Sequence, residues 1–85
     1  MPQTDRYGYE RSLARQYAQK DAARFLTGKL PESLPELLAR KQELLEEARR
    51  NGFADNIAHL EEYLQTFKLL IGYVEVQEVK AEQHA

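Results

Sequence analysis

The sequence of 85 residues contains no cysteine and no tryptophan, and its four glycines are isolated from one another. Without cysteine, a chain has no disulfide framework, no thiolate zinc site and no cysteine nucleophile. Isolated glycines do not form the glycine-rich loop that cradles a phosphate. These absences exclude several common kinds of catalytic and cofactor site, and they are compatible with a reducing cytoplasm.

Long apolar runs are also missing. The longest unbroken one, residues 69–74 counting Gly72, is far shorter than the ~20 residues that span a bilayer. The first six residues lack the apolar region of a signal peptide. We therefore expect a soluble, cytoplasmic protein with no membrane partner.

The sequence offers few side chains that could form a catalytic or metal-binding site. Asp55, His59 and Glu62 share one helical surface, but they include a single imidazole, and the other histidine, His84, lies in a polar tail. No serine or threonine has a base at a recognisable spacing. The sequence predicts a protein that is not an enzyme and holds neither a metal nor a cofactor.

The apolar spacing predicts three helices, at about residues 9–27, 34–51 and 55–78, followed by a flexible tail at 80–85. The predicted fold is a single all-α domain, an up-down-up three-helix bundle with a long C-terminal helix. Gly28 is placed to end the first helix. The apolar face of that helix consists of Leu13, Ala14, Tyr17, Ala18, Ala22 and Phe25, and its alanines would let a neighbouring helix approach closely.

Local signals mark the boundaries of the second helix. Ser33 and Glu36 have the spacing of a capping box, in which each side chain bonds the backbone N–H of the other residue. Gly52 can adopt the left-handed conformation that ends a helix, and Asp55 can cap the next one. These residues predict a short turn between the second and third helices.

The third helix carries two apolar stripes on opposite sides, which is the most informative pattern in the chain. Leu69, Tyr73 and Val76 form the back stripe, with Gly72 between them. The other stripe is a core-facing seam that consists of Ile57, Leu60, Leu64, Phe67, Ile71 and Val74. Because one neighbouring helix cannot bury both stripes, something else must cover the back stripe or it remains exposed.

Two accounts of the back stripe remain open. In one, the segment Tyr7-Gly8-Tyr9 folds across Leu69 and Tyr73 as a lid. In the other, Leu69, Gly72, Tyr73 and Val76 form the surface of a homodimer or of a contact with another protein. Residues 73–79 are rich in β-branched side chains, so an extended edge is the alternative to a helix there.

A polar pair is predicted inside the core. Asp21 and Lys41 interrupt the apolar faces of the first two helices, and an antiparallel hairpin of those helices would place them opposite each other. A buried charge needs a partner, so an ion pair there would fix the register. The alternative is that the Lys41 ammonium reaches the surface past its aliphatic stem.

The two ends of the sequence carry opposite charge, which indicates what each can contact. Residues 1–29 carry a formal charge of +3 and residues 53–85 a charge of −4, so the first and last helices should attract each other. We expect a small interaction protein such as an adaptor, inhibitor or accessory subunit. The alternative is a nucleic-acid-associated regulator that uses the helix-turn-helix-like segment 44–60 and the basic first helix, although Asp55, Glu61 and Glu62 make the following helix acidic.

Overall fold

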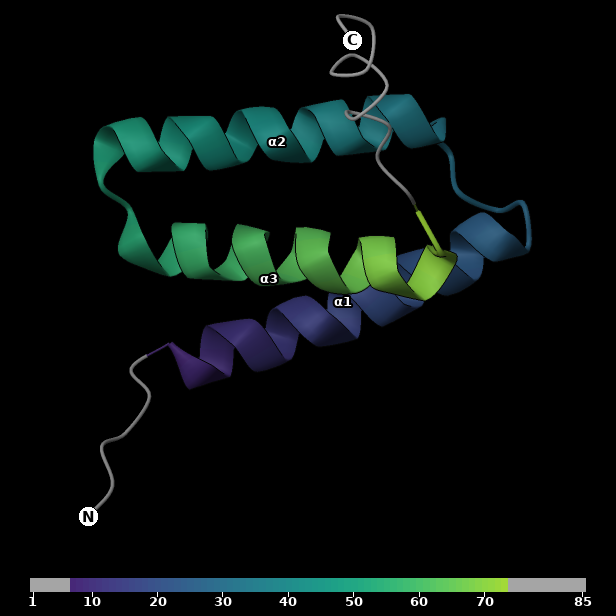
Figure 1. The fold of residues 1–85 in the computed structure, drawn as a ribbon, viewed down its shortest axis with the longest axis horizontal. Helices are drawn as coiled ribbons and strands as arrows, with labels where there is room; N and C mark the ends of the chain where they lie inside the picture. Colours follow the sequence, from purple (N-terminus) through teal and green to yellow (C-terminus); the bar gives the residue numbers. More distant parts are fainter. Residues whose placement is uncertain (1–6, 74–85) are drawn as a thin grey trace, which may run out of the picture.

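The computed structural model describes residues 7–73 as three helices joined by two short connections. The helices are α1 (Gly8–Leu26), α2 (Leu34–Asn51) and α3 (Ala54–Ile71), and they run up, down and up (Figure 1). The predicted all-α bundle is therefore confirmed. The predicted tail at residues 80–85 lies outside the described residues.

Helix α3 holds the bundle together. It packs extensively against α1 and also against α2, whereas α1 and α2 have little contact with each other. Figure 1 shows α2 running along one side of α3 and α1 crossing on the other. The hairpin of α1 with α2 that the sequence suggested is therefore wrong, because both helices use α3 as their common neighbour.

The core is small and lies on both sides of α3. Phe67 is fully buried, with its ring stacked on Tyr63 at 5.7 Å and set edge-on to Phe25 at 6.5 Å. Tyr17, which was predicted to face the core, is half exposed. The buried hydrophobic residues are Ala14, Ala18 and Ala22 of α1, Leu37, Leu45 and Ala48 of α2, and Leu60, Tyr63, Leu64 and Phe67 of α3.

Helix α2 begins with the predicted capping box. The Glu36 N–H donates to Ser33 Oγ at 3.3 Å, and the Ser33 N–H donates to Glu36 Oε1 at 3.1 Å. The helix ends at Gly52, whose φ of +71° lies in the left-handed region that favours glycine. The Phe53 N–H then donates to the Ala48 carbonyl at 3.0 Å, so the chain reverses within two residues and α3 runs antiparallel to α2.

Helix α3 does not begin on the predicted cap. Phe53 occupies the N-cap position, and no side chain caps the helix there. Asp55 lies instead within the first turn, where its carboxylate faces the positive end of the helix dipole.

The predicted continuation of α3 through Gly72 is wrong, because the helix ends at Ile71. Gly72 takes a φ of +71°, the Gly72 N–H donates to the Leu69 carbonyl, and the Tyr73 N–H donates to the Lys68 carbonyl. These bonds satisfy carbonyls that another turn of helix would otherwise have used. With 18 residues each, α2 and α3 are equal in length, and the predicted segment at 74–78 lies outside the described residues.

Candidate interaction surfaces

Exposed apolar side chains gather where α1 and α3 both end, beside the α1–α2 loop. We call this end of the bundle the loop end, and the residues Leu26, Leu69, Leu70, Gly72 and Tyr73 the loop-end patch. Leu69 is 73% exposed and Leu26 63% exposed. Three residues of the predicted back stripe, Leu69, Gly72 and Tyr73, thus lie at the surface, while Val76 lies outside the described residues.

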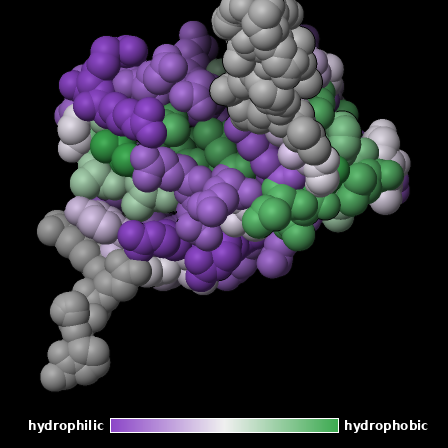
Figure 2. All heavy atoms as spheres, viewed as in Figure 1, coloured by the Kyte–Doolittle hydropathy of each residue, from purple (hydrophilic) through white to green (hydrophobic). Residues whose placement is uncertain are grey.

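Sequence reasoning missed Leu26 and Leu70 as members of this patch. Leu26 lies one residue after Phe25 and so is rotated off the alanine face that packs on α3. Because α1 and α3 run parallel, Leu26 reaches the same end of the bundle as Leu70. Figure 2 shows hydrophobic atoms gathered at this end of the molecule.

The predicted tyrosine lid is wrong. Tyr9 is 72% exposed, and Tyr7 lines a cavity of about 440 Å³ with Ala54, Ile57 and Ala58 near the start of α3. Because α1 and α3 are parallel, residues 7–9 lie near the beginning of α3, about 27 Å along the helix from its end at 1.5 Å per residue. The lid therefore does not reach Leu69 or Tyr73.

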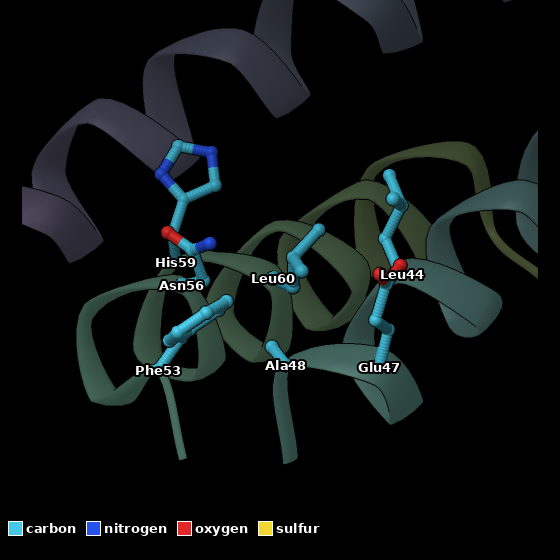
Figure 3. Close-up of a pocket in the computed structure, with 7 residues that line it drawn as sticks. All are labelled: Leu44, Glu47, Ala48, Phe53, Asn56, His59 and Leu60. Atoms are coloured by element: carbon cyan, nitrogen blue, oxygen red, sulfur yellow. The ribbon is translucent and has the colours of Figure 1, made fainter. Parts of the chain in front are cut away.

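A second apolar surface lies at the opposite end, where α2 turns into α3. We call this end the turn end, and the cavity of about 350 Å³ there the turn-end groove (Figure 3). Ala48 and Leu60 are buried at its base, while Leu44 and Phe53 are exposed along it. Its lining residues are Leu44, Glu47, Ala48, Phe53, Asn56, His59 and Leu60.

His59 connects this groove to α1. The His59 ring extends toward α1 in Figure 3, and its Nδ1 lies 3.4 Å from Glu10 Oε1. The ring also lies 6.0 Å from that of Tyr17. Within residues 7–73, no group of three histidines, aspartates or glutamates is arranged to hold a metal ion.

Asp21 and Lys41 meet the same residue rather than each other. The Tyr63 hydroxyl donates to Asp21 Oδ2 at 2.6 Å, and Lys41 Nζ lies 4.5 Å from the centre of the Tyr63 ring. Among the described residues, the ion pair of Asp21 is with Arg24 at 3.8 Å, and no direct pair with Lys41 forms. Tyr63 thus occupies the position between α1 and α2 that the sequence had assigned to the ion pair.

Burial shifts the pKa values of Tyr63 and Lys41. Burial raises the pKa of the Tyr63 phenol well above its usual value, and the hydrogen bond to Asp21 raises it further. Burial also lowers the pKa of Lys41, and the nearby charge of Arg40 adds to that effect. Tyr63 remains a neutral donor at neutral pH, so this cluster acts as a structural link between the helices.

The α2–α3 connection differs from a DNA-binding helix-turn-helix. That motif sets its two helices at roughly 90–120°, whereas α2 and α3 lie side by side and antiparallel. Arg15, one of the basic groups of α1, pairs with Glu62 at 3.1 Å, and Arg49 pairs with Glu61 at 2.9 Å. Two acidic residues of α3 thus neutralise cations that a nucleic-acid surface would need.

Comparisons with protein-family models, with curated proteins and with solved structures gave no match. No helix formed by residues 7–73 is both long and apolar enough to cross a bilayer. Function must therefore be inferred from the two apolar surfaces and the charges around them.

Proposed function

We propose that this chain is a small non-enzymatic protein–protein interaction module that acts through the loop-end patch. The observation that carries the proposal is the exposure of Leu69, at 73%, beside Leu26, Leu70 and Tyr73. Scattered apolar residues on a surface need no explanation, but a group of them at one site usually marks a contact. An adaptor, an inhibitor and an accessory subunit all fit this description.

The fold depends little on Leu69, the most exposed residue of the patch. Phe67, Tyr63 and Leu37 fill the core, and each is at most 1% exposed. Leu69 is not among the core residues and contributes mainly exposed apolar surface. An apolar side chain that lies outside the core and faces solvent contributes most when it is buried against another molecule.

The polar groups support a role in binding rather than in catalysis. Ser33 and Glu36 cap α2, Asp21 accepts from Tyr63, and Glu32 accepts two hydrogen bonds from Arg40 at 2.7 and 2.8 Å. Each of these groups has a structural partner. A catalytic site instead needs a nucleophile or a base free to meet a substrate.

Replacing Leu69 or Tyr73 with lysine should weaken association at least about tenfold without unfolding the chain. Each substitution puts a charge into the apolar patch. The free energy of association should fall by at least the amount that burying a large apolar side chain contributes, about 1.5–3 kcal/mol. That cost corresponds to a loss of affinity of roughly tenfold or more. Light scattering of the purified protein and capture of partners from the native host measure the change.

Gln16→Lys is the matched control, because Gln16 is exposed on α1 and the change adds the same charge away from the patch. It should leave both association and capture intact. Unchanged mass and unchanged capture in Leu69→Lys and Tyr73→Lys would show that the contact surface has been misplaced. Salt-sensitive binding of the wild-type chain to duplex DNA would instead favour the nucleic-acid regulator.

A further inference from the structure

The two ends of the bundle carry opposite charge. When each helix is divided at its midpoint, the loop-end half comprises residues 18–42 and 63–73, and the turn-end half comprises residues 7–17 and 43–62. The loop-end half has six basic and three acidic residues, a formal charge of +3. The turn-end half has four basic and seven acidic residues, a formal charge of −3. The described part of the molecule is therefore strongly dipolar although its net charge is zero.

Local ion pairs leave this contrast unchanged, because each of them joins two groups of the same end. At the loop end, Arg40 holds Glu32, and Glu36 bonds the Ser33 N–H in the capping box. Lys29, in the loop three residues after Leu26, forms no ion pair within residues 7–73 and adds uncompensated positive charge at the loop end. The loop-end patch therefore lies in the half of the molecule that carries excess positive charge.

The turn-end groove has the complementary character. Glu47 lines it, and Glu43 lies one helical turn earlier on α2. Neither glutamate forms an ion pair in the described part of the chain. The apolar base of the groove, Ala48 and Leu60, thus lies beside unpaired carboxylates, while an exposed leucine, Leu44, borders it.

We propose that the loop-end patch of one copy of this chain docks into the turn-end groove of a second copy. This inference rests on the proposed function, because it names the partner of the same patch. Leu69 is the anchor, since it is the most exposed large apolar residue at the loop end, and a groove of about 350 Å³ has room for its side chain. Lys29 of the first copy then approaches Glu43 and Glu47 of the second.

Such a contact is head-to-tail. The two surfaces that meet are different, so each docked copy still presents one free patch and one free groove. Association therefore continues beyond two copies, into an open chain or a closed ring, rather than stopping at a symmetric dimer. The opposite charges of the two surfaces should also make the contact weaken as salt is added.

Two variants that each block one surface test this arrangement. Leu69→Lys blocks the patch and leaves the groove intact, while Leu44→Lys blocks the groove and leaves the patch intact. Both positions are exposed on helices, so both variants should fold, which circular dichroism checks. Sedimentation velocity of the wild type, of each variant alone and of a one-to-one mixture measures the mass of each species.

One chain has a mass of 9.9 kDa. We expect the average mass of the wild type to exceed this value as the protein concentration rises, and to return toward it when salt is added. Each variant alone should remain at the mass of one chain, with association at least about tenfold weaker than that of the wild type. The mixture should form a complex of two chains and no larger species, because only one patch and one groove remain able to meet.

Other outcomes overturn the head-to-tail contact in distinguishable ways. If Leu69→Lys is monomeric but Leu44→Lys associates like the wild type, the patch binds a surface other than the groove, and the proposed function stands. A wild-type chain that is always monomeric, but whose partner capture is lost in Leu69→Lys, has a different protein as its partner. A monomeric wild type whose capture is unaffected by Leu69→Lys overturns both proposals.

Discussion

Replacing Phe67 with alanine is expected to lower the free energy of unfolding by about 3–5 kcal/mol. Phe67 is fully buried, stacks on Tyr63 and meets Phe25 edge-on, so its removal leaves a cavity between α1 and α3. A domain of this size has a total stability of about 5–15 kcal/mol, so the loss is a large fraction of it. Chemical denaturation followed by circular dichroism measures the change.

The matched control for Phe67→Ala is Leu69→Ala on the same helix. Leu69 is 73% exposed, and its truncation should change the free energy of unfolding by no more than about 0.5 kcal/mol. In thermal unfolding, the loss at Phe67 corresponds to a fall in Tm of at least about 12 °C. Equal effects of the two substitutions would mean that Phe67 is not at the centre of the core.

Replacing Ala18 with leucine is expected to destabilise the chain by about 2–3 kcal/mol. Ala14 and Ala18 are fully buried and Ala22 nearly so, and these residues form the side of α1 that packs on α3. The larger side chain has no space there, so α1 must move away from α3 or adopt a strained rotamer. Denaturation experiments on the purified variant measure the loss.

Ala23→Leu provides the comparison, because Ala23 is exposed on the same helix and the chemical change is identical. Its effect should stay within about 0.5 kcal/mol. Should Ala18→Leu be as mild as Ala23→Leu, the close approach of α1 to α3 would be refuted.

The parts of the fold that depend on local signals were predictable. The capping box of Ser33 and Glu36, the left-handed turn at Gly52 and the helical period of the seam each depend on neighbours within a few residues. The alanines of α1 likewise indicated a close helix contact, which the structure places against α3. Local geometry alone thus specified three helices and most of their buried faces.

The sequence-based predictions that were wrong include one that required knowing which helices pack together. The expected pair of Asp21 with Lys41 assumed that consecutive helices pack together, whereas both residues meet on Tyr63 of α3. The spacing of apolar residues does not specify whether α1 packs mainly against α2 or against α3. The end of α3 was also mispredicted. The apolar stripe continues past Gly72 in the sequence, but Gly72 adopts a left-handed conformation, its N–H bonds the Leu69 carbonyl, and the helix ends at Ile71.

The functional inference follows from this arrangement of helices. Because α1 and α2 cover separate sides of α3, neither of them covers Leu69. The loop-end patch is therefore surface that folding does not use. Positive charge beside it and negative charge beside the turn-end groove suggest that the chain's own copies are suitable partners.

The central claim is that Leu69 serves contact with another molecule and not the stability of the single chain. Denaturation of Leu69→Lys at a concentration where the chain is monomeric tests this claim most directly. We predict a free energy of unfolding within about 0.5 kcal/mol of the wild type, as for a substitution on an open surface. A loss of about 2 kcal/mol or more, typical of a buried leucine, would show that Leu69 belongs to the core and would contradict the account.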